Sequence, residues 1–326
     1  MRILVTGATG KVGQTFLQKL FAPDGIPDAK VRALCHSREV QDHAQVEVIR
    51  GSIDDPEVVQ QAMVGVTHVL HLATCKETPQ RIMDVSVKGL FWLLEQCRHS
   101  STFERFLLIG GDASVGHFFY PHPLPVTETQ PHSAYPGCYA LSKVREEVML
   151  EQYYVQYDLD GCCLRAPWIM EKDDFKHSLS FGYEVFGGPR WCDLVDQEAA
   201  QANAAAGTVP KMCNQDGVPI KRNFVHVDDL VGAILIALRH PKARQQLFHI
   251  CMNEPIDYGQ LASYLAETRQ LPSVEVRTDY ASTWLDNGKA RFVLGWQPEY
   301  DMSRMVDAAF DYQRAPDDPR TVFYPG

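Results

Sequence analysis

The sequence predicts an α/β protein with a doubly wound parallel sheet and a smaller C-terminal lobe. Short apolar runs at 3–5, 31–34, 46–49, 66–72 and 106–109 alternate with segments of helical periodicity. This alternation is typical of a parallel sheet covered by helices on both faces. The first run ends in a glycine-rich turn that opens a helix, which also favours this class.

The remaining elements follow in order. A helix is expected to begin at 55–57, where a proline and two acids stand, and further helices are expected over 87–97 and about 139–154. A strand at 162–164 follows. Beyond Met170 clean strands become few, and the alanine-rich segment from Asp196 to Ala206 reads as a helix ended by Gly207. A strand at 224–227 and helices at 230–238 and 258–269 complete the pattern. We therefore predict a dinucleotide-binding domain at 1–170, rejoined by 222–251, and a substrate-binding lobe made of 171–221 and 252–326.

Composition narrows the class of function. The chain has 326 residues, of which 45% are hydrophobic and 22% charged, and these are ordinary globular values that argue against disorder. The formal charge of 31 − 41 = −10 leaves no global basic field for nucleic acid, so a small molecule is the expected partner.

Cysteine usage and hydropathy point to a cytoplasmic protein. Nine cysteines with no CxxC pair favour reduced thiols over a disulfide framework or a metal site. No apolar stretch approaches the ~20 residues that span a bilayer. Met1 and Arg2 lead directly into a strand, so neither a signal peptide nor membrane attachment is expected.

The glycine-rich turn carries the first candidate site. It reads TGATGKVG over residues 6–13 and includes Gly7, Thr9, Gly10, Lys11, Val12 and Gly13. Glycines at these positions permit a sharp turn and close approach of the backbone to a pyrophosphate, which the helix N-terminus then faces. The turn therefore predicts a dinucleotide site.

Tyr139 and Lys143 form the second candidate site. Four residues apart in a predicted helix, they lie on one face. An ammonium near the phenol favours the phenolate form, so Tyr139 could move an alcohol proton while hydride passes to or from a nicotinamide.

Taken together, these motifs resemble the extended short-chain dehydrogenase/reductase family, also called the NAD-dependent epimerase/dehydratase family. The matching segments are TGATGKVG at 6–13, HLAT at 71–74, YALSK at 139–143, RNFVHVDDLVGA at 222–233 and DNGKARFVLGWQP at 286–298. The resemblance implies a Rossmann-type domain, a nicotinamide cofactor, a Tyr/Lys pair assisted by a hydroxyl group, and often a homodimer. It also implies further cofactor contacts from His36, Ser52, Ile53, Leu72, Ala73, Thr74 and Ala166, beside Tyr139 and Lys143.

The sequence departs from the family pattern where the assisting hydroxyl is expected. The segment at 109–116 places Gly111 at that position, with Asp112 beside it. Ser114 is the nearest hydroxyl and Asp112 its competitor. Trp168 and Ser86 stand where nucleotide-sugar enzymes often carry Asn, which favours sugar or sugar-acid dehydrogenases over nucleotide-sugar enzymes.

His117, Trp168 and Arg222 are the expected substrate contacts. Three functions remain open: an oxidoreductase acting on a secondary alcohol, a nucleotide-sugar epimerase or dehydratase that keeps its cofactor, and a regulatory protein that senses dinucleotide without turnover. The intact Tyr139 and Lys143 argue against the third.

The end of the second strand bears on the choice between NAD and NADP. An acid there would bind the ribose of NAD and repel the 2′-phosphate of NADP. Cys35 stands at that position and Ser37 and Arg38 follow, so a phosphate could be held. Binding of both cofactors is expected, with a lean toward NADP.

Overall fold

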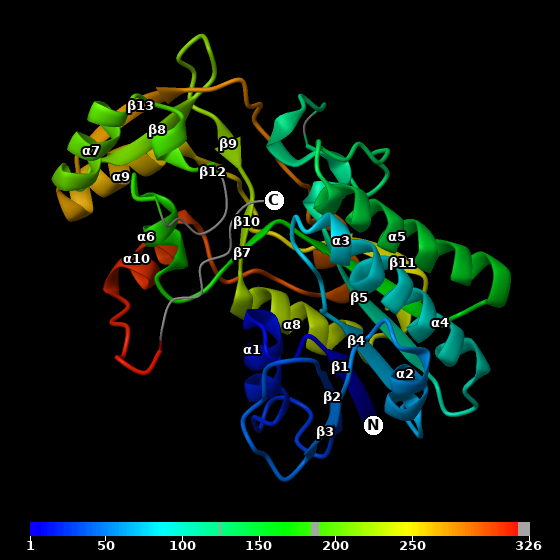
Figure 1. Cartoon of the computed structure of the whole chain (residues 1–326). Coiled ribbons are helices and arrows are strands. Elements are labelled where there is room, and N and C mark those ends of the chain that lie inside the picture. Colours follow the sequence, from blue (N-terminus) through cyan, green and yellow to red (C-terminus); the bar gives the residue numbers. More distant parts are fainter. Residues whose placement is uncertain (124, 184–188, 319–326) are drawn as a thin grey trace.

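Seven parallel strands form the central sheet, which confirms the predicted class (Figure 1). The computed structural model describes residues 1–123, 125–183 and 189–318. The strand order is β3-β2-β1-β4-β5-β6-β11. The bounds are β1 Arg2–Thr6, β2 Lys30–Cys35, β3 Val46–Arg50, β4 His68–His71, β5 Arg105–Gly111, β6 Gly161–Ala166 and β11 Gln246–His249.

Helices cover both faces of this sheet. On one face α1 (Lys11–Leu20) packs with α8 (Val227–Ala237), and on the other lie α2 (Pro56–Met63), α4 (Gly89–His99) and α5 (Cys138–Tyr157). Successive β1 residues alternate between the two layers. Ile3 and Val5 join the core under α1 and α8, while Leu4 joins the core under α2 and α4.

The order of the strands creates a crevice between β1 and β4, at the carboxyl ends of the strands. The chain runs from β1 outward to β3, and then returns to place β4 on the other side of β1. Ligands of such sheets bind at this reversal, beyond the carboxyl ends of the strands. The loops and short helices there are α3 (Pro79–Ile82), the π-helical η1 (Met83–Lys88), and the 3-10 turns η2 (Asp112–Val115) and η3 (His117–Phe119).

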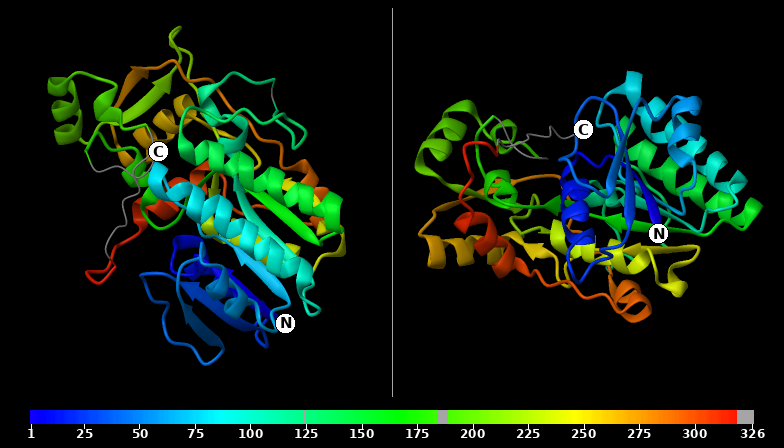
Figure 2. Two further views of the ribbon diagram at one scale, coloured as in Figure 1. Left: turned by 45° about the vertical axis from the view of Figure 1, so that its right-hand side comes forward. Right: turned by 90° about the horizontal axis from the view of Figure 1, so that it is seen from below.

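The second lobe lies beside these strand ends, to one side of the sheet in both views of Figure 2. Its core gathers Phe175, Trp191, Phe224 and Tyr258. Its elements are β7 (Trp168–Met170) with β10 (Phe224–His226), β8 (Val209–Cys213) with β13 (Ser273–Arg277), β9 (Lys221–Arg222) with β12 (Ile256–Asp257), α6 (Asp174–Ser178), η4 (Trp191–Asp193), α7 (Gln197–Ala206), α9 (Tyr258–Arg269) and α10 (Met302–Asp311). Two short helices, η5 (Pro241–Ala243) and η6 (Ala290–Leu294), lie near β11 and α8.

The sequence pattern gave no sign of β8, because its partner β13 comes some sixty residues later in the chain. Residues 184–188 and 319–326, which the sequence assigned to the lobe, lie outside the described residues.

The strand β11 forms one border of the sheet, and two side chains bond to its outer backbone groups. The N–H of His249 donates to Oε1 of Glu128 at 3.0 Å, and Nζ of Lys289 donates to the carbonyl of Leu247 at 2.9 Å. At the opposite border, β3 is largely exposed, and its Glu47 pairs with Arg32 at 2.9 Å.

Candidate active site

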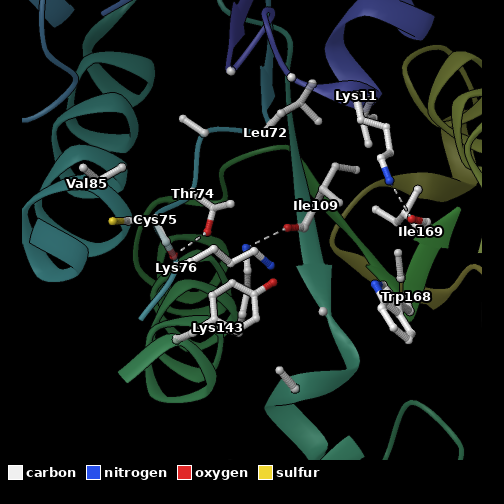
Figure 3. A pocket seen from close by; sticks show the side chains of 18 of the residues that line it. Lys11, Leu72, Thr74, Cys75, Lys76, Val85, Ile109, Lys143, Trp168 and Ile169 are labelled. Carbon is white, nitrogen blue, oxygen red and sulfur yellow. Dashed lines mark hydrogen bonds between the residues drawn. The ribbon is translucent and has the colours of Figure 1, made fainter. Parts of the chain in front are cut away.

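A cavity of about 800 Å³ opens at the carboxyl ends of the strands and reaches into the lobe. Its wall contains every residue that the sequence suggested for a site, with the exception of Ser114. These are Gly7, Thr9, Gly10, Lys11, Val12, Gly13, His36, Arg38, Ser52, Ile53, Leu72, Ala73, Thr74, Asp112, His117, Tyr139, Lys143, Ala166, Trp168 and Arg222. Figure 3 shows this cavity, with Lys11 and Trp168 on one side of Ile109 and Lys76 and Lys143 on the other.

The glycine-rich turn forms one end of the cavity. Gly7 has φ +72°, and a Cβ there would lie 2.8 Å from the backbone nitrogen of Ala73, so the turn needs glycine at this position. Gly10 is the N-cap of α1 and has no side-chain cap, which leaves the helix N-terminus open to a ligand. The turn therefore fits a pyrophosphate.

Lys11 joins this turn to the lobe. Its Nζ donates to the carbonyl of Ile169 at 3.1 Å and forms an ion pair with Asp174 in α6. Burial lowers the pKa of Lys11, and the ion pair with Asp174 offsets only part of that effect. Asp174 is 163 residues away in the chain, so sequence reasoning missed this pair.

Tyr139 and Lys143 lie in the first turns of α5, against the end of β5. Nζ of Lys143 donates to the carbonyl of Ile109 at 3.3 Å and to Oε2 of Glu146 at 2.7 Å. Burial alone would lower the pKa of Lys143, but the Glu146 carboxylate outweighs it and raises that pKa. The Glu146 carboxylate thus favours the charged form of Lys143, whose Nζ lies 5.8 Å from the centre of the Tyr139 ring in the wall of the cavity.

The loop after β4 holds the N-terminus of α5 through a contact that the sequence did not indicate. The carboxylate of Glu77 accepts the backbone N–H of Cys138 at 2.8 Å and that of Tyr139 at 3.0 Å. It thereby caps the N-terminus of α5 from a distant segment. A Cβ at Gly137 would lie 2.5 Å from Oε1 of Glu77, so this cap depends on glycine at 137.

Ser114 differs from the expectation, because its side chain does not face the cavity. It is fully buried, and its hydroxyl donates to Oε1 of Glu147 at 3.0 Å. Glu147 also accepts two hydrogen bonds from Arg165, at 3.1 and 2.6 Å, and interacts with His132 at 2.9 Å. The 3-10 turn η2 directs Ser114 toward α5 and leaves Asp112 and Gly111 on the cavity side.

Asp112, His117 and Arg222 form a chain of contacts on the lobe side of the cavity. Nδ1 of His117 contacts the Asp112 carboxylate, and Nη2 of Arg222 lies 2.8 Å from Nε2 of His117. Because arginine only donates, Nε2 is the acceptor and the ring proton lies on Nδ1. Burial lowers the pKa of His117, and Asp112 opposes this only in part.

The guanidinium of Arg222 lies 4.2 Å from the ring centres of both Phe118 and Trp168. His117, which accepts from Arg222, therefore orients that guanidinium and does not act as a free base in this arrangement. The backbone of His117 has φ +53°, a value uncommon outside glycine, so the position of its ring depends on the turn after Gly116.

With this geometry established, the comparisons with known proteins decide the family. Residues 3–170 match the model of the NAD dependent epimerase/dehydratase family. The chain belongs to this family. It is therefore an enzyme of the NAD(P)-dependent epimerase, dehydratase and dehydrogenase group.

Relatives across the family differ in activity. The chain is 24% identical to mitochondrial L-threonine 3-dehydrogenase of Sus scrofa, over 96% of this chain and 83% of that protein. It is 26% identical to UDP-glucose 4-epimerase of Mycolicibacterium smegmatis, over 96% of this chain and 99% of that protein.

Solved structures agree with the fold. A short-chain dehydrogenase/reductase superfamily protein from Agrobacterium tumefaciens with bound NAD is similar at a TM-score of 0.79 and 25% identity, covering 95% of this chain and 96% of that one. UDP-glucose 4-epimerase of Thermotoga maritima with UDP-glucose has a TM-score of 0.73 at 21% identity, covering 96% and 98%.

No helix among the described residues is long and apolar enough to cross a bilayer. In the same part of the chain, no three or more His, Cys, Asp or Glu side chains come together as metal ligands.

In this member of the family, two adjacent glycines are expected to respond differently to serine. A Cβ on Gly111 would lie 3.8 Å from the Tyr139 hydroxyl and 3.7 Å from Lys143, which is ordinary contact. Gly111→Ser should therefore fold normally and raise turnover about tenfold, through one new hydrogen bond of about 1.4 kcal/mol beside the reacting oxygen.

The matched control is Gly110→Ser. A Cβ there would lie 2.8 Å from both Sγ of Cys163 and Oε1 of Glu147, so we expect a loss of about 1–3 kcal/mol of stability. Thermal melts and steady-state kinetics of both variants check this prediction. Equal destabilisation by the two substitutions would contradict it.

Proposed function

We propose that this enzyme oxidises or reduces a secondary alcohol or ketone of a sugar or sugar-acid-like small molecule, with a nicotinamide cofactor that exchanges between turnovers. The observation that carries the proposal is the shared cavity. Tyr139 and Lys143 lie in the same cavity as the glycine-rich turn, and the lobe closes its far side. When bound, the nicotinamide supplies or accepts a hydride.

The glycine-rich turn and three side chains of the cavity have defined tasks in this proposal. The turn at 7–13 holds the pyrophosphate, and Tyr139 donates or removes the proton of the reacting oxygen. Lys143 supplies a fixed positive charge next to Tyr139. Asp112, which follows Gly111 and lines the cavity, is the candidate for the role of the missing hydroxyl, because Ser114 is bonded to Glu147 and lies outside the cavity wall.

The test is incubation with NAD⁺ or NADP⁺ and a panel of sugars, uronic acids and hydroxy acids, following the absorbance of the reduced nicotinamide. Accumulation of reduced cofactor in step with product supports the proposal. Interconversion of two UDP-sugars without net reduction would instead favour an epimerase, the activity of the relative from Mycolicibacterium smegmatis.

For the cofactor, we propose that Arg38 gives a preference for NADP. Cys35, His36, Ser37 and Arg38 line the cavity at the end of β2, and no aspartate or glutamate of that loop does. Glu39, the nearest acid, is paired with Arg50. Within the described residues, no acid makes an ion pair with Arg38.

Arg38→Ala should therefore weaken NADP binding about tenfold or more, the value of one charged hydrogen bond, and leave NAD binding unchanged. Parallel calorimetric titrations at one ionic strength measure both affinities. Arg239→Ala is the control, because Arg239 is exposed at the opposite ends of the strands. Wild-type binding of NAD at least tenfold tighter than NADP, unaffected by Arg38→Ala, would reject the preference.

We also propose a cytoplasmic homodimer that forms through α4 and α5. The nine cysteines are free thiols, as in a reducing compartment. Leu141, Val148 and Val155 recur every seven residues along α5 and are 41%, 38% and 73% exposed, and Phe91 on the neighbouring α4 is 38% exposed. This stripe is the pattern of a helix–helix seam.

Val155→Asp together with Val148→Asp should convert a dimer into a monomer, because two carboxylates would have to be buried unpaired. Light scattering gives the mass. Val218→Asp is the control, since Val218 is 58% exposed in the loop between β8 and β9. A wild-type monomer at micromolar concentration would overturn the proposal.

A further inference from the structure

Lys76 is a cation that the sequence motifs did not single out. It follows β4 in the loop that also carries Glu77, and it lines the cavity. Its Nζ lies 4.1 Å from the centre of the Tyr139 ring, closer than Lys143. Figure 3 shows Lys76 on the same side of the cavity as Lys143.

The charge of Lys76 acts on groups at both ends of the cavity. Burial is the main cause that lowers the pKa of Lys11 and of His117, and the charge of Lys76 adds to both effects. Lys11 belongs to the glycine-rich turn and His117 to the lobe side. The charge of Lys76, an exposed side chain beside Tyr139, therefore reaches both the dinucleotide end and the substrate end.

Four other cations of the cavity wall have partners. Lys11 pairs with Asp174, Lys143 with Glu146, and Arg190 with Asp193 at 2.7 Å. Arg222 contacts His117 and hydrogen-bonds Tyr258. In the described part of the chain, by contrast, no acid makes an ion pair with Lys76.

The acids of the cavity wall are already engaged. Among the residues that the structure describes, the wall contains two carboxylates: that of Asp112, in contact with His117, and that of Asp193, paired with Arg190. A protein with a formal charge of −10 thus presents, beside its candidate catalytic tyrosine, an exposed ammonium that pairs with no described acid. Such a charge favours an anionic ligand.

The location of Lys76 decides which anion fits. The reacting carbon must lie at the Tyr139 hydroxyl, so an anion held by Lys76 is close to that carbon. A carboxylate attached one or two carbons from the alcohol meets this condition. The diphosphate of a nucleotide sugar sits on the anomeric carbon, several bonds from the carbon-4 hydroxyl on which 4-epimerases act, and does not meet it.

We propose that Lys76 binds the carboxylate of the substrate next to the reacting alcohol, so that the enzyme acts on a hydroxy acid such as a sugar acid. This inference rests on the proposed function, which it makes more specific. It assigns to Lys76 the selection of the substrate class, while Tyr139 and Lys143 serve the reaction itself.

The experiment compares acids with their uncharged amides. Uronates, aldonates and β-hydroxy amino acids, each beside its carboxamide, are titrated by calorimetry into cofactor-saturated enzyme and then assayed for turnover. At least one acid should bind about tenfold or more tightly than its amide, as one charged hydrogen bond provides. Lys76→Met should bring that ratio close to one, and Lys76→Arg should restore part of it.

Lys88→Met is the matched control, because Lys88 is exposed like Lys76 but lies at the end of η1, outside the cavity wall. It changes the net charge equally and should leave the ratio of acid to amide affinity intact. This comparison separates a contact with the substrate from a general electrostatic effect.

The remaining outcomes overturn the inference in distinguishable ways. If no acid in the panel binds more tightly than its amide, or if UDP-sugars without a carboxylate bind best, the carboxylate assignment falls. If Lys76→Met lowers kcat equally for acids and amides, Lys76 acts on the reacting oxygen instead. In any of these cases, turnover of the amides that depends on Tyr139 would leave the proposed oxidoreductase activity standing. If instead acids bind through Lys76 but are not turned over, the oxidoreductase activity is rejected and the carboxylate site is retained.

Discussion

Tyr139→Phe is expected to lower turnover about 100-fold or more while cofactor affinity stays within a few-fold of wild type. The substitution removes the phenol oxygen of Tyr139, which transfers the proton in the proposed reaction, and keeps the ring. Loss of a general acid or base costs about that much. The ring retains its place beside Lys76 and Lys143, because a phenyl face attracts cations as well. Steady-state kinetics and a cofactor titration measure the two effects separately.

Tyr135→Phe is the matched control. Tyr135 lines the same cavity, stacks on Phe119 with ring centres 4.6 Å apart, and has a raised pKa because it is buried. It is a poor proton donor or acceptor, so its loss should change turnover by only a few-fold. A strong effect at Tyr135 with a weak one at Tyr139 would mean that the two tyrosines have exchanged roles.

Gly10→Val is expected to abolish cofactor binding and leave the fold intact. The backbone of Gly10, at φ −85° and ψ 172°, is extended and suits valine. A Cβ there would come within 3.3 Å of the Gly7 carbonyl and, within 4 Å, would meet nothing else. The side chain would thus extend into the space that a pyrophosphate needs.

Gly13→Ala provides the contrast within the same turn. Its Cβ would lie 2.6 Å from the Cα and carbonyl oxygen of Ala8 and from the carbonyl of Gly7, so the backbone would have to move. We expect lower thermal stability for Gly13→Ala, and a wild-type melt without cofactor binding for Gly10→Val. Calorimetry that finds normal affinity in Gly10→Val would disprove the role of the turn.

Much of the fold could be predicted because its signals are local. The apolar run at 3–5, the glycines that follow it and the helix at 258–269 each depend on neighbouring residues, and the structure confirms all three. The helix at 197–206 is likewise framed by Asp196, which caps it, and by Gly207. The lobe was harder to predict, since β8 and β9 are short and pair with strands far along the chain.

The site likewise combines features that the sequence predicts with features that it does not. The sequence located the turn and the Tyr/Lys pair, which now share one cavity, but it could not show which way the side chains of the β5 loop point. The turn η2 decides this by directing Ser114 to Glu147 and leaving Asp112 near His117. The contributions of Glu77 and Lys76 were also missed, because each lies more than sixty residues from the helix that it contacts.

The two side chains bonded to the outer side of β11 have a consequence for the behaviour of the protein in concentrated solution. The border strand of a sheet is normally a template on which another chain can add a strand, and this is a common start of aggregation. Here Glu128 and Lys289 already bond to His249 N–H and the Leu247 carbonyl, the groups that would begin such a ladder. At the other border, the charges of Glu47 and Arg50 on β3 would have to be stripped of water before a second sheet could join. Side chains at both border strands thus oppose the addition of a further strand to the parallel sheet, as a covering helix does in other proteins.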